Sequence, residues 1–439
     1  MSDVKVCKFG GTSVATAAQM RKVKAIIEAD PARRIIVPSA PGRAHSDDAK
    51  VTDLLYLTHE MASNQQDIGP VWNRIVERFQ GLVSDLGLDL DLSATLEEVR
   101  ARIQSGAGAD YAASRGEALN GLIVAALLGA TYIDAAEVVR IAPGRRIDPA
   151  SHALIRAACA DDAQRYVIPG FYGSDQHGQV LTFSRGGSDV SGALAAAALD
   201  AAVYENWTDV SGVLAADPRI VSGSRTIAEI TYGELREMAY MGASVLHDEA
   251  VFPVRERGIP INIRNTDRPD DPGTMIVNRR EPGDQIVVGI AGRAGFTVFA
   301  LEKMMMNVEV GFGRRVLDVF ERFGIAYEHT PTGIDTMSVV VADEAIGEGR
   351  GEAIAEELRA AVHPERLDIL PGMALVATVG LGMNHHVGVA GRLFSALAQA
   401  QVNVRMIDQG SSEQNIIIGV EADDLHKAIT TIYQEFIAS

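Results

Sequence analysis

The stretch that decides the fold is Val4-Lys5-Val6-Cys7-Lys8-Phe9-Gly10-Gly11-Thr12-Ser13. Its first six residues are typical of a short buried strand, and a helical spacing of apolar residues follows the glycines. A strand that runs through a glycine turn into a helix presents backbone N–H groups to an anion. We expect Thr12 or Ser13 to cap that helix, and the Lys8 ammonium to reach phosphate oxygens. The segment is not a Walker A loop, and an ordinary strand–turn–helix connection has the same pattern.

Composition limits the class of protein. The chain has 439 residues, 47% of them apolar, and a formal net charge of −18. This length predicts two to four domains, and the acidic balance argues against a nucleic-acid partner. Only two cysteines occur, Cys7 and Cys159, so the sequence carries no disulfide framework. No signal peptide is read, and the longest apolar stretch, 119–133, is too short and glycine-interrupted to span a membrane. We therefore expect a cytoplasmic protein without a membrane partner.

The order of the predicted elements indicates an α/β fold. Residues 1–275 alternate short β-rich runs with helical stretches, as in an α/β sandwich around a largely parallel sheet. Strands are predicted at Val4–Phe9, Arg34–Pro38, Ala130–Asp134, Arg165–Pro169, Val203–Trp207 and Pro260–Arg264. Turn-rich breaks at 268–273 and 280–283 place a domain boundary near residue 285.

The C-terminal third contains an internal repeat with an offset of 77 residues, which aligns Arg315–Glu328 with Arg392–Arg405. The same offset pairs two further sets of apolar runs: Phe296–Leu301 with Met373–Thr378, and Ser338–Val341 with Asn415–Ile418. Each copy is expected to form a small βαββαβ module, and the two modules can pair within one chain or between two chains. The predicted domains are 1–284, 285–365 and 366–439.

A second glycine turn, Thr182-Phe-Ser-Arg-Gly-Gly-Ser-Asp189, opens a predicted helix at 190–199. Ser188 or Asp189 is expected to cap that helix. Arg185 offers a bidentate fork to a carboxylate or a phosphate, although a capped helix with a solvated arginine has the same pattern.

Other candidate site residues lie near predicted helix starts. Glu117 precedes a buried helix predicted from Ala118, where the helix dipole favours an acid. The alternative is that Glu117 receives the ammonium group of an amino-acid substrate. Ser39 follows a predicted strand, and Thr52 with Asp53 forms a plausible helix N-cap.

A set of polar residues follows the strand that ends at Trp207. Thr208 and Asp209 come directly after this strand, and Asp217-Pro218-Arg219 follows a short loop. Such residues can hold the ribose and phosphates of a nucleotide, although a capped turn with a surface ion pair is equally consistent with them.

Together these segments resemble the aspartokinases of the amino-acid kinase superfamily. Lys8–Val14 resembles the opening motif of that family, and Met406–Glu413 resembles its second ACT-domain signature. The motifs between them fall in the family's order: Ser39-Ala40, Thr52-Asp53, Ser114–Glu117, Arg185–Asp189, Thr208-Asp209 and Asp217–Arg219. The resemblance covers nearly the whole chain. It implies an αβα kinase domain with a largely parallel sheet, followed by two ACT-like modules.

The resemblance also implies a role for each motif residue. Lys8 would stabilise the transferring phosphoryl group, and Asp189 would organise Lys8. The substrate-binding residues would be Ser39, Thr52, Glu117 for the α-ammonium and Arg185 for the α-carboxylate. The ATP-binding residues would be Lys8, Gly10, Gly11, Ser13, Thr208, Asp209 and Arg219. ATP and Mg²⁺ are implied, with no protein ligands of the metal identified.

Three positions depart from the family pattern. Ser244 stands where many members carry a lysine, and Leu214 stands where an aromatic residue often packs on the nucleotide. The run Glu328–Asp335 differs from that of lysine-sensitive members. Glu328 and Asp335 are candidates for binding an amino-acid effector, lysine or threonine, and the modules imply at least a homodimer.

The implied activity is phosphorylation of the β-carboxylate of L-aspartate. A carboxylate with a reference pKa of about 4 is ionised at neutral pH, so positioning and charge neutralisation replace a general base. One alternative is a related kinase acting on glutamate, an N-acetylated amino acid or UMP. Another is a non-catalytic amino-acid sensor, which Ser244 favours and Lys8, Arg185 and Asp189 disfavour.

Overall fold

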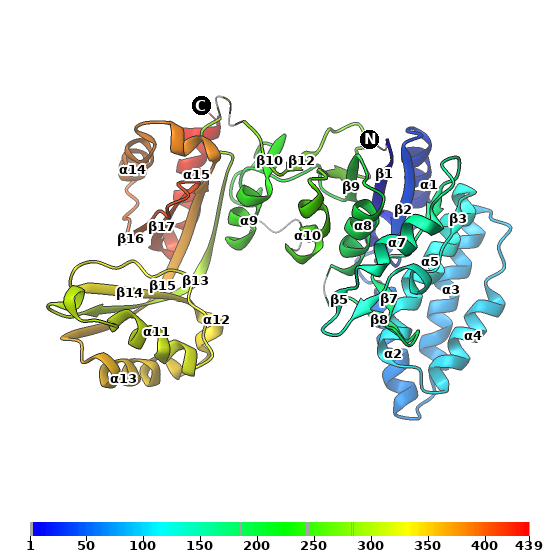
Figure 1. Cartoon of the computed structure of the whole chain (residues 1–439), viewed down its shortest axis with the longest axis horizontal. Coiled ribbons are helices and arrows are strands. Elements are labelled where there is room, and N and C mark those ends of the chain that lie inside the picture. Colours follow the sequence, from blue (N-terminus) through cyan, green and yellow to red (C-terminus); the bar gives the residue numbers. More distant parts are fainter. Residues whose placement is uncertain are drawn as a thin grey trace. The chain divides into compact units, whose positions relative to one another are not determined.

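The computed structural model describes residues 3–184, 186–242, 246, 248–281, 283 and 285–438. The chain divides into two compact units (Figure 1). The first unit comprises 1–213, 228–232 and 245–280, and the second comprises 214–227, 233–244 and 281–439. The last crossing between the units lies close to the boundary expected near residue 285. The two earlier segments that belong to the second unit, 214–227 and 233–244, were not predicted.

The first unit is built on one sheet. In its described part, eight strands are arranged in the order β10-β12-β11-β9-β1-β2-β6-β3. Their bounds are β1 (Lys5–Phe9), β2 (Arg33–Pro38), β3 (Thr131–Tyr132), β6 (Tyr166–Val167), β9 (Val203–Thr208), β10 (Glu229–Thr231), β11 (Ile261–Asn265) and β12 (Thr274–Val277). The pair β11 and β12 is antiparallel, and the other neighbouring pairs are parallel. All six strands predicted from the sequence lie in this sheet, so the expected largely parallel sheet is confirmed.

Helices cover both faces of this sheet. Residues of α1 (Ala17–Glu28) and α5 (Ala109–Leu128) share a hydrophobic core with Cys7 and Phe9 of β1. Lys8 points to the other face, where α8 (Gly187–Ala198) lies, because successive strand residues alternate. Further elements of this unit are α2 (Val51–Ser63), α3 (Gly69–Leu86), α4 (Ser93–Gln104), α6 (Ala135–Val138), α7 (Ala150–Ala158), α10 (Asp248–Arg257), the turn η1 (Gly11–Val14) and the hairpin strands β4 (Ile141–Ala142), β5 (Arg146–Ile147), β7 (Tyr172–Ser174) and β8 (Val180–Thr182).

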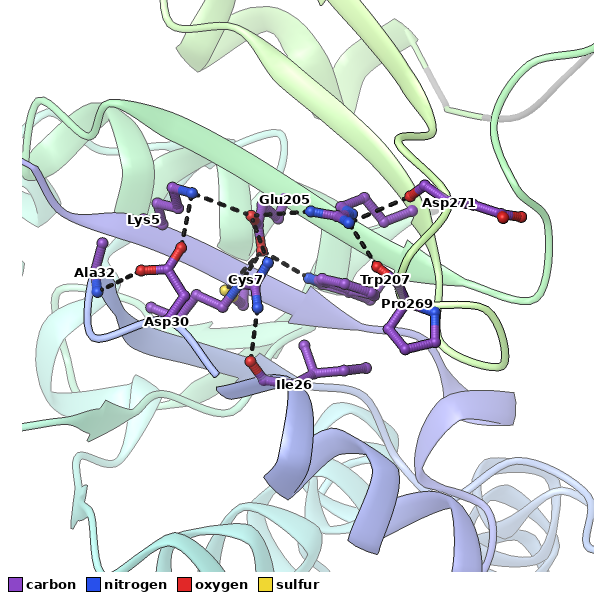
Figure 2. Close-up of polar contacts among 11 residues, drawn as sticks. Lys5, Cys7, Ile26, Asp30, Ala32, Glu205, Trp207, Pro269 and Asp271 are labelled. Atoms are coloured by element: carbon purple, nitrogen blue, oxygen red, sulfur yellow. Dashed lines mark hydrogen bonds and ion pairs between the residues drawn. The ribbon is translucent and has the colours of Figure 1, made fainter. Parts of the chain in front are cut away.

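A buried carboxylate, Glu205 on β9, lies on the α1 face of the sheet and is 1% exposed. The side chains around it, which we call the Glu205 cluster, are Lys5, Cys7, Arg33, Trp207 and Arg264. Figure 2 shows these polar contacts converging on Glu205. The Nε of Arg33 lies 2.8 Å from Oε2, and the indole N–H of Trp207 donates to the same oxygen at 2.9 Å. This pairing offsets the cost of burying the charge and links β1, β2, β9 and β11.

The second unit also contains one sheet in its described part, a five-stranded antiparallel one in the order β14-β13-β15-β17-β16. Its strands are β13 (Gly289–Glu302), β14 (Thr336–Ala342), β15 (Arg366–Val379), β16 (Met406–Asp408) and β17 (Asn415–Glu421). Its helices are α9 (Tyr232–Tyr240), which begins in the first unit, α11 (Phe312–Arg322), α12 (Asp343–Ile346), α13 (Arg350–Val362), α14 (Val389–Gln399) and α15 (Leu425–Tyr433). Short turns are η2 (Met306–Val308), η3 (Leu381–His385), η4 (Ala422–Asp424) and η5 (Gln434–Ala438).

The two repeats share this second sheet instead of forming two separate ones. The strand β14 pairs with the second half of β13, and β17 pairs with the second half of β15. Phe296 of β13 pairs with Met373 of β15, its equivalent in the repeat, so an approximate two-fold axis passes between them. The expected strand after α11 is reduced to an isolated bridge between His329 and Val340, whereas its counterpart β16 is formed.

None of the helices among the described residues is long and apolar enough to cross a membrane.

Candidate active site

The glycine loop after β1 packs against the loop that follows β2. The N–H of Gly10 donates to the carbonyl of Trp207 at 3.0 Å, and the N–H of Gly42 donates to the carbonyl of Gly11 at 2.9 Å. A Cβ on Gly42 would lie 2.7 Å from the carbonyl carbon of Gly11, so this approach of two backbones requires glycine. The expected strand–glycine turn–helix is therefore present, held from both sides.

The predicted N-caps of the following helix were wrong. Thr12 and Ser13 lie in the turn η1, and α1 is capped by Thr16, whose side chain accepts a hydrogen bond from the N–H of Gln19 at 3.3 Å. The extra turn arises because η1 is stabilised separately. The Ser13 hydroxyl lies 2.8 Å from that of Thr266, which follows β11. Thr266 was not predicted, because its partner is 253 residues away in the chain.

Three side chains meet beside this loop on the α8 face of the sheet. Lys8, 8% exposed, places its Nζ 2.6 Å from Oδ1 of Asp189. Asn206 of β9 donates from Nδ2 to the same Asp189 oxygen at 2.8 Å, and its Oδ1 accepts from Lys8 at 3.4 Å. The structure thus brings together the two predicted catalytic residues. Asn206 was not predicted, although its position directly opposite Lys8 follows from the parallel register.

The start of α8 differs from the expected cap. Gly186 is the N-cap with a left-handed φ of 58°, and Ser188 and Asp189 lie in the first turn. A glycine adopts this conformation without strain, and no side chain at the N-cap bonds the first N–H groups of the helix. Asp189 instead directs its carboxylate to Lys8. The predicted substrate residue Arg185 lies outside the described residues.

Glu117 lies in the middle of α5, because the helix begins at Ala109 and not at Ala118 as predicted. The helix dipole therefore does not explain this acid. Glu117 is 5% exposed, and its Oε2 has no hydrogen-bond partner among the described residues. Burial raises the pKa of the Glu117 carboxyl from 4.5 to about 8, although a backbone hydrogen bond from Ala40 and the charge of Arg115 act in the opposite direction. A buried acid with an unpartnered oxygen is typical of a ligand site.

The loop after β2 connects this carboxylate to the glycine loop. The N–H of Ser39 donates to the carbonyl of Phe9 at 3.0 Å, and the carbonyl of Ser39 accepts from Nδ2 of Asn120 at 2.6 Å. Asn120 is fully buried, and its Oδ1 has no partner in the described part of the chain. Asn120 was not predicted; its spacing of three residues from Glu117, which places both on one helix face, was the available signal.

Thr52 lies in the first turn of α2, whose N-cap is Lys50, so the predicted cap at Thr52 was wrong. Thr208 ends β9, and its hydroxyl donates to Oδ1 of Asp209 at 3.1 Å. The side chain of Asn265 donates to the carbonyl of Asp209 at 3.3 Å and so ties this turn to the end of β11.

Two predicted nucleotide-side positions belong to the second unit. The guanidinium of Arg219 binds the Asp217 carboxylate, with Nη2 at 2.6 Å, and its side chain is 87% exposed. Leu214 forms an isolated bridge with Thr226. Ser244 lies outside the described residues. The ATP-binding role of Arg219 stays a prediction.

The effector candidates also lie in the second unit. Glu328 accepts hydrogen bonds from the Tyr240 hydroxyl and, at 3.4 Å, from Nη2 of Arg293. Burial, and next the contact with Glu328, raise the pKa of Tyr240 to about 12. Oδ1 of Asp335 accepts from the N–H of Met305 at 2.9 Å. Each carboxylate thus has protein partners of its own.

Comparison with known proteins identifies the class. The model of the amino acid kinase family matches residues 3–265, and that of an ACT domain matches residues 376–436. The fold and the site therefore define an amino acid kinase with a C-terminal ACT region.

Similar proteins narrow this class further. Aspartokinase 3 of Bacillus subtilis is 36% identical over 450 residues, which cover 99% of each chain. The aspartate kinase of Clostridium acetobutylicum is 48% identical, with a TM-score of 0.92 over 99% of this chain and 100% of that one. Escherichia coli aspartokinase III, solved with lysine and aspartate, is 26% identical with a TM-score of 0.76, over 99% of this chain and 100% of that one. Its structure with aspartate and ADP has a TM-score of 0.71, with 98% and 99% covered. The chain belongs to the aspartokinase family, and it is an ATP-dependent kinase with a carboxyl acceptor.

Proposed function

We propose that this chain transfers the γ-phosphoryl group of ATP to the β-carboxylate of L-aspartate, giving 4-phospho-L-aspartate and ADP. This reaction is the first step toward lysine, threonine and methionine. One bond forms between a β-carboxylate oxygen and the γ-phosphorus, and the bond to the bridging oxygen of ADP breaks. The acceptor carboxylate is already ionised, so no general base is needed.

The observation that supports this proposal is that the glycine loop after β1 and a buried carboxylate border the same short segment, 39–42. Gly42 contacts the glycine loop, and Ala40 contacts the carboxylate of Glu117. An amino acid held at Glu117 would therefore lie beside a nucleotide phosphate held at Gly10 and Gly11. Such juxtaposition is the main contribution of an enzyme to phosphoryl transfer.

On the amino-acid side, the unpartnered Oε2 of Glu117 would accept from the α-ammonium of aspartate. Arg185 would bind the α-carboxylate through two parallel hydrogen bonds, and Ser39 and Thr52 would orient the side chain. A kinase for N-acetylated amino acids would have no ammonium for Glu117 to receive.

On the nucleotide side, Lys8 would neutralise charge on the moving phosphoryl group, and Asp189 would hold Lys8 in place. Further contacts to ATP would come from Gly10, Gly11, Ser13, Thr208, Asp209 and Arg219. Among the described residues no group of three or more His, Cys, Asp or Glu side chains could hold a metal ion. Mg²⁺ would instead bind together with ATP, since this ion commonly keeps several waters and only one or two protein carboxylates.

The test is coupled detection of ADP release with L-aspartate, with L-glutamate and without an acceptor. Aspartate-dependent release well above the other two is expected. Release with glutamate alone supports the related-kinase alternative, and no acceptor-dependent release supports the non-catalytic sensor.

We further propose feedback regulation through the second unit. Escherichia coli aspartokinase III has been solved with lysine. In this chain the ammonium of lysine, or the corresponding group of threonine, would compete with Tyr240 and Arg293 for Glu328. Asp335, which accepts from Met305 at the other end of β14, would offer a carboxylate at a separate position. An effector shifts the enzyme only if it binds the active and inactive arrangements with different affinity.

The regulation is tested by assaying the full chain with lysine, threonine and methionine, singly and in pairs. Inhibition by one of them, reduced in Glu328→Gln and Asp335→Asn but not in the exposed control Glu356→Gln, is expected. No change in rate or thermal midpoint with any amino acid would exclude a sensing role. A homodimer or larger homo-oligomer, measurable by sedimentation, and a cytoplasmic location complete the proposal.

A further inference from the structure

We propose that Asn206 is a positioning residue for phosphoryl transfer, which holds the Lys8 ammonium and the Asp189 carboxylate in one arrangement without adding charge. The proposal rests on the function proposed above for Lys8. The register of the sheet places Asn206 beside Lys8. Lys8 of β1 and Asn206 of β9 are direct partners in parallel strands, so their side chains stand together on the α8 face.

The amide of Asn206 uses both of its ends. Its Nδ2 donates to Oδ1 of Asp189 at 2.8 Å, while its Oδ1 accepts from Nζ of Lys8 at 3.4 Å. The opposite orientation would direct Nδ2 at the ammonium and the carbonyl oxygen at the carboxylate, and both contacts would be repulsive. The two charged neighbours therefore fix the amide, and Asn206 is only 3% exposed, which restrains it further.

This arrangement affects the direction of the lysine. An ammonium has three donors; Asp189 and Asn206 take two of them, which leaves one for a phosphoryl oxygen. A lysine side chain has high rotamer entropy, so a second anchor reduces the cost of ordering it. Since the anchor is neutral, the pair stays one ammonium against one carboxylate. A second carboxylate here would repel the incoming phosphates and hold Lys8 back from them.

The same strand supplies a matched control. Tyr204, two residues earlier and on the same face, donates from its hydroxyl to the backbone carbonyl of Asp189 at 3.3 Å. Tyr204→Phe removes a contact to the same residue of α8 but leaves the Lys8–Asp189–Asn206 group intact. This variant therefore measures how much of any loss in kcat comes from a general loosening of α8.

The experiment compares the full-length wild type with Asn206→Leu, Asn206→Asp and Tyr204→Phe by steady-state ADP release. Asn206→Leu is expected to lower kcat by about tenfold or more, while KM for aspartate and KM for ATP stay within about threefold of wild type. The reason is that misplacing a catalytic group by about 1 Å can cost a factor on the order of 10² in rate. Asn206→Asp is expected to move the acid limb of the kcat profile to higher pH, because two adjacent carboxylates raise the pKa of the pair. Tyr204→Phe is expected to keep both kcat and the acid limb.

An unchanged kcat in Asn206→Leu, or an equal loss in Tyr204→Phe, overturns the proposal. A loss confined to KM also overturns it. If Asn206→Leu does not fold, as judged by its thermal midpoint, Asn206→Asp decides: an acid limb at the wild-type pH contradicts a role beside Asp189. If the wild type releases no ADP with aspartate, the proposed function is wrong and this proposal falls with it.

Discussion

Nζ of Lys8 and Oδ1 of Asp189 lie 2.6 Å apart, although 181 residues separate them along the chain. The strand β1 places the lysine at the glycine loop, and the first turn of α8 places the carboxylate on the same face of the sheet. The ammonium thus has a fixed position before any phosphate arrives. Preorganised charge of this kind stabilises a transition state without reorganisation during the reaction.

For Lys8→Ala we therefore expect kcat to fall by a factor on the order of 10² or more, with a much smaller change in KM for aspartate. Steady-state kinetics with both substrates varied provide the measurement, and Lys24→Ala on the exposed side of α1 is the control. A change confined to KM would show that Lys8 binds only the ground state.

The raised pKa of Glu117 predicts a pH dependence of substrate binding. If Glu117 binds the α-ammonium of aspartate as proposed, binding requires the ionised carboxylate, whereas this group is protonated below its folded pKa of about 8. KM for aspartate should therefore fall by about tenfold per pH unit as pH rises toward 8 and then level off. Glu117→Gln should raise KM and remove this dependence, whereas the exposed control Glu97→Gln should retain it. A wild-type KM that is flat from pH 6 to about 8 would contradict a protonated Glu117.

The same group predicts a change in stability with pH. The folded pKa of about 8 is higher than the ordinary 4.5, so between these values the folded state keeps a proton that the unfolded state has lost. The contribution of the protonated Glu117 to folding stability is fully present below about pH 4.5 and is lost as pH rises toward 8. Urea unfolding at pH 5.5 and 8 should show a smaller loss of stability for Glu117→Gln than for the wild type. Equal losses in both proteins would argue that Glu117 is ionised in the free enzyme.

The Glu205 cluster predicts a large effect on stability without contact to substrate. Arg33→Met leaves Glu205 without its 2.8 Å partner, and removing one member of a buried ion pair costs about 3–5 kcal/mol. Asp200→Asn, which neutralises an exposed carboxylate paired with Arg156 and Arg257 and tolerates the left-handed φ of 47° at this position, should cost about 1 kcal/mol or less. Denaturant titration compares the two. Similar losses would mean that the buried cluster contributes no more than a surface pair.

The close approach of two loops predicts that Gly42→Ala is damaging. The added Cβ would lie 2.7 Å from the backbone of Gly11, which cannot move without displacing the glycine loop. We expect a higher KM for ATP and a lower thermal midpoint. Gly81→Ala, where a Cβ meets nothing within 4 Å in α3, should instead be stabilising by about 1 kcal/mol. Wild-type kinetics in Gly42→Ala would show that the loops tolerate separation.

The sequence predicted most of the first unit because strands and glycine turns have local signals. The strand at Lys8, the turn at Gly10 and the helix that carries Asp189 were all found in this way. The helix ends were less predictable, since Thr16 and Gly186 replace the expected caps where the turn geometry competes. For Glu117 the structural alternative, an acid favoured by a helix dipole, was wrong, because the residue lies in the middle of α5 and is buried.

Long-range relationships could not be predicted from local pattern. Thr266 and Asn206 contact site residues through strand pairing, which depends on the order of strands in the sheet. The repeat was visible in the sequence. That both modules share the paired strands β13 and β15 depends on the length and register of these two strands. Segments 214–227 and 233–244 join the second unit through contacts that are distant in the chain, such as the hydrogen bond from the N–H of Ile290 to the carbonyl of Ala215.

Phosphorylation of aspartate on its β-carboxyl group can be tested by identifying the acyl phosphate that the purified full-length chain forms. Incubation with ATP, Mg²⁺ and L-aspartate in the presence of hydroxylamine traps an acyl phosphate as a hydroxamate, and mass spectrometry of the fragments locates it on the α- or the β-carboxyl group. We expect aspartate β-hydroxamate in an amount equal to the ADP released, with little product from L-glutamate. Absence of hydroxamate from aspartate, its formation on the α-carboxyl group, or a larger yield from glutamate would contradict the proposed reaction.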